Sequence, residues 1–301
     1  MGRRAGEAGA WWAVDVGRSP ERAIPAVDVP TLAELGLGDE VRPTSWIRLV
    51  VATRPFAAAG AVSGLWLAGW WLAALAAVPV LYGWSLTAIH HLIHGSLRYG
   101  ARTRSRLLTA VSLVLLESGH ALERTHLQHH QTDPTSDDPE GYIESLGWWR
   151  LLAEAPLFRY RLWLWAIRNP GSSATGRRRG AEIAWHVAVT ALAVSLAAAH
   201  LAGVEVGRVG WGIVAYVGTQ HLANATFAVL AARGPHTNWG RAAPTPLIAV
   251  RGRLSRWLLF GHVWHLEHHF YPEVPLPLLA AVADRIEPVL RDRNALVVTT
   301  P

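Results

Sequence analysis

Residues 46–94 read WIRLVVATRPFAAAGAVSGLWLAGWWLAALAAVPVLYGWSLTAIHHLIH, an almost unbroken apolar run that ends in a histidine cluster. A helix that crosses the hydrocarbon core of a membrane needs roughly 20 apolar residues, and this run holds nearly two such lengths. It predicts a helical hairpin with spans at about 47–65 and 68–90 that turns in the segment GLWLAGWW. His90 and His94 then lie one helical turn apart at the end of the second span.

A second hairpin is predicted further along the chain, with spans at 181–201 and 209–232 joined by the short segment AGVEVGR. Polar, arginine-rich stretches follow each hairpin, at 98–180 and 233–301. The expected fold is therefore an all-α integral membrane protein with two transmembrane hairpins (four spans) and a cytosolic helical cap.

The composition supports a membrane protein. Hydrophobic residues make up 51% of the 301 residues and charged residues only 17%, which is unusually apolar for a soluble protein. The 16 tryptophans point the same way, because Trp collects at membrane interfaces. The absence of cysteine excludes disulfides, Cys-ligated zinc and a built-in iron–sulfur cluster. No long apolar core follows the positive N-terminus, so no cleavable signal peptide is expected.

The placement of the arginines predicts the topology. The formal charge of +6 comes entirely from arginine, since the chain has no lysine, and the hairpin turns carry only Glu205 and Arg208. By the positive-inside rule, both termini and all histidine clusters are expected on the cytoplasmic side of the cell membrane. Nucleic acid is not an expected partner, because phosphate binding requires a basic face rather than positive flanks. The arginines outside the turns include Arg98, Arg102, Arg104, Arg150, Arg159, Arg161, Arg168, Arg177, Arg178, Arg179, Arg233, Arg241, Arg251, Arg253 and Arg256.

Three segments are expected along the chain: a cytosolic N-terminal arm at 1–45, a membrane domain at 46–285 and a C-terminal tail at 286–301. Within the first polar stretch, residues 146–168 read LGWWRLLAEAPLFRYRLWLWAIR and mix Trp, Leu and Arg at helical spacing. This pattern predicts an interfacial helix on the cytoplasmic leaflet.

Eight histidines fall into three clusters that read HHLIH, HLQHH and HLEHH. Residues three and four apart share a helix face, so each cluster is a helical ligand set. Eight imidazoles are too many for one ion, because structural zinc takes four ligands and octahedral iron at most six. We expect two ions, with iron the better candidate because an open His-rich site can bind dioxygen. No HExxH motif occurs, which excludes a zinc protease of that type. The predicted ligands are His90, His94, His126, His129, His130, His265, His268 and His269.

Further polar residues are candidates for a ninth ligand or for orienting the imidazoles. His236 lies just past the predicted membrane edge, whereas His221 would lie about 18 Å deep at 1.5 Å per residue. His221 and Asn224 therefore remain rival ligands or substrate-pocket residues. Carboxylates near the clusters are candidate partners of the imidazoles, including the loop of Asp133, Asp137, Asp138 and Glu140. The candidates for supporting or replacing a ligand are His91, His120, Glu123, Asp138, His221, Asn224, His262 and Glu267, while His186 and His200 are expected to be structural.

These motifs resemble those of the membrane fatty acid desaturase superfamily, the integral-membrane non-haem di-iron enzymes. The resemblance rests on HHLIHGSL at 90–97, HLQHH at 126–130 and HLEHHFYPEVP at 265–275, and covers about residues 45–285. It implies a mostly helical four-span fold, a di-iron site on the cytosolic side ligated by the eight clustered histidines, and use of O2 with external electrons. HGSL and the later DDPE are also similar to carotenoid ketolases and hydroxylases. The first cluster departs from the common pattern of the superfamily, in which an acidic residue often occupies the position held here by His91.

The leading interpretation is an O2-dependent desaturase acting on a lipid acyl chain, with a carotenoid ketolase or hydroxylase as the alternative. A His-rich membrane metal transporter or a haem protein is the alternative from another class. Transporters place ligands near the membrane midplane, and haem needs only one or two axial histidines. Since the chain cannot carry its own iron–sulfur cluster, a separate ferredoxin- or cytochrome-type electron donor is expected to dock at the arginine-rich cytosolic surface.

Overall fold

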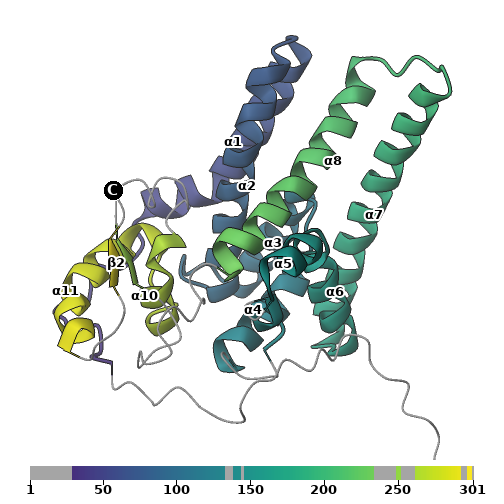
Figure 1. Cartoon of the computed structure of the whole chain (residues 1–301). Coiled ribbons are helices and arrows are strands. Elements are labelled where there is room, and N and C mark those ends of the chain that lie inside the picture. The colour runs from purple at the N-terminus through teal and green to yellow at the C-terminus, as the bar shows by residue number, and fades with distance from the viewer. Residues whose placement is uncertain are drawn as a thin grey trace, which may run out of the picture.

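The computed structural model of the chain describes residues 29–132, 138–143, 146–233, 249–251, 262–292 and 297–299. The secondary structure of the described residues is helical apart from one pair of three-residue strands, so the predicted helical fold is confirmed. Figure 1 shows two long hairpins that point the same way, with the shorter helices gathered at their opposite end.

The first hairpin consists of α1 (Ser45–Leu67) and α2 (Trp71–His94), which confirms the predicted pair of helices. The Thr44 hydroxyl caps α1 by accepting a hydrogen bond from Ile47 N at 3.2 Å. Gly95, at φ 66°, ends α2 in the left-handed conformation that glycine adopts without steric cost. This termination leaves the two histidines of the first cluster on the last turn of α2.

The second hairpin consists of α7 (Ser173–Leu201) and α8 (Arg208–Phe227), and α8 continues into a π-helical turn, η3 (Ala228–Arg233). The turns of the two hairpins lie together, because Trp66 Nε1 donates a hydrogen bond to the Arg208 carbonyl at 2.8 Å. Arg208 in turn donates to the Leu67 carbonyl at 2.8 Å. The hairpins are therefore joined at the end that lies away from the shorter helices (Figure 1).

Among the described helices, α1, α2 and α7 are long and apolar enough to cross a membrane, with mean hydropathies of 1.3, 1.7 and 1.6. The fourth predicted span, α8, is not among them. Its second half carries Gln220, His221 and Asn224, which lower its hydropathy although the preceding residues are apolar.

The chain between the hairpins forms α3 (Ala101–Leu115), α4 (Gly119–Thr132), η1 (Gly141–Ile143), α5 (Trp148–Glu154), η2 (Ala155–Leu157) and α6 (Phe158–Arg168). The predicted single helix over 146–168 is wrong in this respect: Pro156 lies at the start of the tight turn η2, which separates α5 from α6. Trp149 on α5 is 87% exposed, whereas Arg159 on α6 is 1% exposed. The segment thus has both an exposed apolar surface and a buried charge.

The C-terminal region contains β1 (Ala249–Arg251), η5 (His262–Trp264), α10 (His265–Phe270), η6 (Leu276–Leu278), α11 (Leu279–Asp292) and β2 (Val297–Thr299). The strands pair in parallel, with Ala249 opposite Val297. One face of α11 packs with α10 and with Leu37 and Val41 from the segment before α1 into a single apolar core. This packing fixes α10, which carries the third histidine cluster.

The N-terminus of α4 is capped by a carboxylate from α7. Glu182 Oε2 accepts hydrogen bonds from the Ser118 hydroxyl at 3.0 Å and from His120 N at 3.1 Å, and Glu182 Oε1 accepts from His120 Nδ1 at 2.7 Å. Glu182 is fully buried. A negative charge is favourable beside the free N–H groups at a helix start. Glu182 therefore ties the second hairpin to the helix that carries the second histidine cluster.

We predict that Glu182→Ala lowers the free energy of unfolding by about 3 kcal/mol, because it leaves buried donors of His120 and Ser118 without an acceptor. Glu182→Gln, which keeps an acceptor but loses the charge, costs about 1 kcal/mol. Denaturation of the purified protein in detergent measures both. Glu205→Ala in the exposed turn between α7 and α8 is the matched control and changes little. Equal stability of Glu182→Ala and the control would contradict the capping role.

Candidate metal centre

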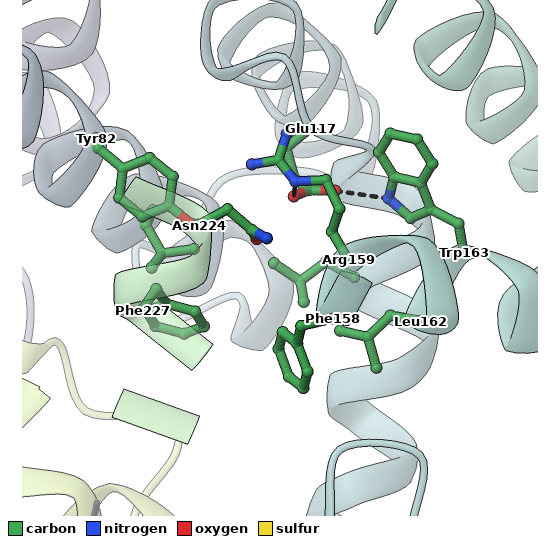
Figure 2. A pocket seen from close by; sticks show the side chains of 10 residues that line it. Tyr82, Glu117, Phe158, Arg159, Leu162, Trp163, Asn224 and Phe227 are labelled. Atoms are coloured by element: carbon green, nitrogen blue, oxygen red, sulfur yellow. Dashed lines mark hydrogen bonds and ion pairs between the residues drawn. The ribbon is translucent and has the colours of Figure 1, made fainter. Parts of the chain in front are cut away.

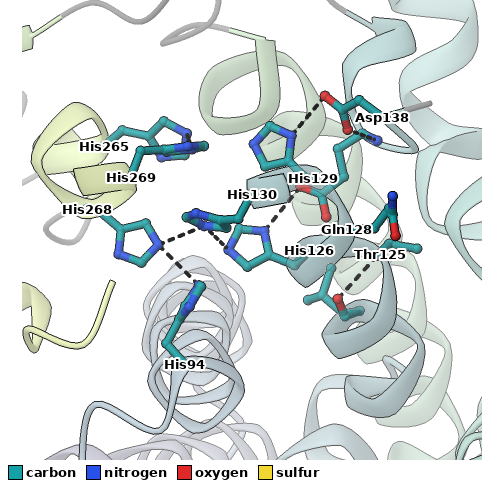
Figure 3. A network of polar contacts seen from close by, with 12 residues as sticks. His94, Thr125, His126, Gln128, His129, His130, Asp138, His265, His268 and His269 are labelled. Atoms are coloured by element: carbon teal, nitrogen blue, oxygen red, sulfur yellow. Dashed lines mark hydrogen bonds and ion pairs between the residues drawn. The ribbon is translucent and has the colours of Figure 1, made fainter. Parts of the chain in front are cut away.

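The three histidine clusters converge from three helices. The C-terminal turn of α2 carries His90 and His94, while α4 and α10 each carry three clustered histidines. Figure 3 shows the imidazoles of these helices facing a common centre, where His268 of α10 lies between His94 of α2 and His130 of α4. All eight predicted ligands therefore meet in one site, although the clusters are up to 179 residues apart, from His90 to His269.

Seven of the imidazoles form two groups. Group A is His90, His94, His126 and His268, and group B is His129, His265 and His269. Within each group the ligand atoms all lie within 4.8 Å of one another. His130 lies between them: its Nε2 is 3.2 Å from His126 Nε2 and 3.1 Å from His268 Nε2, and its ring stacks on His269 at 4.2 Å.

The spacing of the ring nitrogens fits metal ligation. The Nε2 atoms of His268 and His94 are 3.2 Å apart, and those of His269 and His265 are 3.1 Å apart. Ligands held about 2.1 Å from one ion are separated by roughly 3.0 Å in an octahedral arrangement and roughly 3.4 Å in a tetrahedral one. Each group therefore has the ligand separation of a single ion, and two groups fit two ions.

His268 is held in the form that binds metal. Burial, together with the neighbouring imidazoles of His90, His94, His130 and His269, lowers the pKa of His268 well below its usual value. A neutral imidazole offers a lone pair to a cation, whereas a protonated one does not. His268 therefore contributes a lone pair and no positive charge to this buried site.

Each group is supported by one carboxylate from the segment after α4. His129 Nδ1 donates to Asp138 Oδ2 at 2.9 Å, and His126 Nδ1 lies 3.3 Å from Glu140 Oε2. Asp138 is buried, and its other oxygen accepts from Glu140 N at 2.8 Å. A Cβ atom at Gly141 would collide with the Asp138 carboxylate, so the close approach requires glycine there. A carboxylate on Nδ1 fixes the ring so that Nε2 faces the centre.

Asp138 remains ionised in this position. Burial alone raises the pKa of Asp138, but the hydrogen bond from His129 and the backbone N–H groups of Glu140 and Gly141 outweigh it and lower the pKa below its usual value. The carboxylate is therefore available to accept the His129 proton at neutral pH.

None of the other described candidates is a member of group A or B. Nδ1 of His91 contacts the Ser96 hydroxyl at 2.9 Å, His120 binds Glu182, and Glu123 pairs with Arg104 at 3.4 Å. None of these three belongs to group A or B. His262 begins η5, but its side chain is outside the described residues, as are His236, Asp133 and Asp137. Glu267 is fully buried on α10.

The two candidates on α8 lie outside both groups. His221 Nδ1 donates to the Val217 carbonyl at 2.8 Å, and its Nε2 lies 2.7 Å from the Tyr160 hydroxyl. Asn224 is 3% exposed and lines a small cavity. Neither belongs to the described metal-ligand groups.

Sequence reasoning missed a buried ion pair beside this cavity. Arg159 Nε lies 3.3 Å from Glu117 Oε2, and Glu117 Oε1 accepts a hydrogen bond from Trp163 Nε1 at 2.6 Å. Figure 2 shows both contacts. The sequence indicates Arg159 only as one of the arginines outside the hairpin turns. The signal that could have found the pair is Glu117, an acidic residue that directly follows the apolar run VSLVLL.

The sequence model of the fatty acid desaturase family matches residues 47–301, which include both hairpins and all three histidine clusters. The chain belongs to this family. The resemblance indicated by the three motifs is therefore confirmed. The family is one of oxidoreductases, so the histidine-rich centre belongs to a chain of an oxidoreductase family. No curated protein matches the chain closely enough to add a relative to the comparison.

We predict that Asp138→Asn weakens metal retention about 10- to 100-fold, because an amide holds the His129 ring less firmly than a carboxylate does. Competition of metal-loaded protein with a chelator measures the retention, and circular dichroism checks that helicity is unchanged. Asp39→Asn, which alters an exposed ion pair with Arg42, is the matched control. Retention equal to that of the control would show that Asp138 does not support the centre.

Proposed function

We propose that the chain is an O2-dependent, membrane-bound di-iron oxidoreductase that desaturates the acyl chain of a lipid. The observation that carries the proposal is the pairing of two histidine groups, bridged by His130, in a chain of the fatty acid desaturase family. Iron bound there would supply the oxidant that removes hydrogen from an unactivated C–H bond, with O2 as co-substrate.

The donor set favours iron and leaves room for O2. Eight imidazoles shared by two ions give about four ligands each, which leaves about two positions open on an octahedral iron. A closed tetrahedral zinc site would leave no such position. The protein's own residues hold the ligands and exclude water: His90, His126, His129, His265 and His268 are all buried. Asp138 and Glu140 hold the Nδ1 protons of His129 and His126.

An apolar substrate from the bilayer suits the surroundings of the centre. Leu86 and Ile89 precede and adjoin His90 on α2, and both are buried in an apolar cluster. The outer surfaces of the hairpins carry exposed apolar side chains such as Leu72 at 84% and Val194 at 64%. Such surfaces match lipid rather than water. The surroundings of the centre on the α2 side are therefore apolar, as approach by a lipid chain requires.

Electrons must come from a separate donor in this proposal, because the chain has no cysteine to ligate an iron–sulfur cluster. Arg98, Arg102, Arg106 and Arg177 are exposed where α3 and α7 begin. The two helix starts lie side by side, since Arg178 donates a hydrogen bond to Ser105. An acidic ferredoxin- or cytochrome-type protein would be steered to this basic surface.

Production of the chain in a host, followed by lipid and carotenoid profiling, tests the reaction. We expect new acyl double bonds with the wild-type protein, and their loss in His268→Ala, which removes a group A imidazole. New keto or hydroxyl carotenoids would instead support a carotenoid ketolase or hydroxylase. If no O2-dependent product forms when iron and reductant are supplied, the proposed function is wrong.

We further propose that α8 is the fourth span and that the histidine centre faces the cytoplasm of the cell membrane. The common direction of the two hairpins and the bonded turns at Trp66 and Arg208 support this arrangement. Burial of the polar residues of α8 against neighbouring helices reduces the cost of a span that is less apolar than the others.

The absence of cysteine allows a direct test of topology with single introduced cysteines. We expect Val204→Cys, in the turn between α7 and α8, to react with an impermeant maleimide in intact cells. Arg102→Cys, at the start of α3, is the matched control and should react only after the cells are permeabilised. The opposite labelling, or labelling of both positions from one side, would contradict the proposed topology.

A further inference from the structure

A small cavity lies one helical turn from group A. It is lined by Leu86, four residues before His90 on α2, and by Leu122, four residues before His126 on α4. Residues four apart on a helix are neighbours on one face, about 6 Å apart along the axis. The cavity therefore adjoins two helices that supply group A, on the side from which α2 enters from the first hairpin.

The cavity walls are mostly apolar, with a few polar groups among them. Phe158, Leu162 and Phe227 form much of the apolar wall, and the polar lining groups are Tyr82, Glu117, Arg159 and Asn224 (Figure 2). The free space is only on the scale of one water molecule. It suits the end of a chain or a single oxygen-bearing group rather than a whole lipid.

The two charges in the wall are paired with each other, although Arg159 Nε itself forms no hydrogen bond. The charges of Glu117 and Arg159 compensate each other at 3.3 Å. Glu117 also accepts hydrogen bonds from Trp163 Nε1 at 2.6 Å and Ser118 N at 2.9 Å, and Arg159 donates to the Leu116 carbonyl at 2.8 Å. The pair therefore adds no net charge to the cavity and does not select a charged ligand.

Asn224 differs from these groups. Its side chain is 97% buried, being 3% exposed, and points into the middle of the cavity in Figure 2. No hydrogen bond joins its amide to any other described residue, whereas Glu117 and Arg159 each bond to neighbouring groups. A buried amide without a partner is unfavourable, so a group in the cavity that bonds to Asn224 would be stabilised.

We propose that this cavity binds the neutral, oxygen-bearing end of the substrate, with the Asn224 amide hydrogen-bonded to a hydroxyl or carbonyl oxygen. Calling the ligand a substrate rests on the proposed function, but the binding itself can be measured without turnover. It narrows the substrate class to a long apolar molecule with a neutral oxygen function. A carboxylate end is disfavoured, because the paired Arg159 leaves no spare positive charge, and a methyl end leaves the amide unbonded.

Binding of tritiated 1-hexadecanol to the purified full-length protein in detergent tests the proposal. Unlabelled 1-hexadecanol, hexadecanoate and hexadecane, which share a 16-carbon chain and differ at one end, are the competitors. We expect 1-hexadecanol to compete at least about tenfold better than the other two, because only it satisfies the amide without adding a charge. Equal competition by the alcohol and the alkane would overturn the proposal and would leave Asn224 a partner of bound water only.

Two variants test whether Asn224 causes the preference for 1-hexadecanol over hexadecane. Asn224→Leu, which keeps the side-chain volume, should lower the affinity for 1-hexadecanol about tenfold and leave that for hexadecane unchanged or improved. Asn169→Leu at the exposed end of α6 is the matched control and should keep the preference. Retention of the preference in Asn224→Leu would also overturn the proposal. The competition in the wild-type protein remains decisive if Asn224→Leu does not fold.

These outcomes are separate from the proposed function. A protein that prefers the alcohol but yields no oxidised product would keep the cavity assignment and lose the desaturase assignment. A protein that forms double bonds but binds the alcohol and the alkane equally would do the reverse.

Discussion

The structure depends on the close burial of imidazoles from three helices. Nε2 atoms such as those of His268 and His94 approach to 3.2 Å in a site where burial and the neighbouring imidazoles keep His268 unprotonated. Lone pairs gathered this closely repel one another and have lost most of their contact with water. A bound cation would convert that cost into a stabilising interaction, and would thereby couple metal binding to the folding of this end of the protein.

The rest of the fold holds these three helices in place. Gly95 ends α2 directly after His94, the buried face of α11 fixes α10, and Glu182 of α7 caps α4. These supports come from segments far apart in the sequence, and each acts on a different helix. A loss at any one of them should therefore loosen one set of ligands and leave the other two in place.

Local patterns made much of this predictable from the sequence. Helical spacing identified all eight clustered histidines, the apolar run gave the first hairpin, and the acidic loop gave Asp138. The grouping of the ligands was not predictable, because spacing defines a helix face and not its neighbours. His126 and His129 are one turn apart on α4, yet they belong to different groups. Glu182 was missed for the same reason, since its partner His120 is 62 residues away.

The most direct test of the account is the number and environment of the metal ions in protein produced with 57Fe. Elemental analysis with Mössbauer and X-ray absorption spectroscopy should give two iron ions per chain, each bound mainly by imidazole nitrogen. His265→Ala, which alters only group B, should retain the iron of group A and lose much of the other. A single ion per chain, or zinc in protein that is active, would contradict the account.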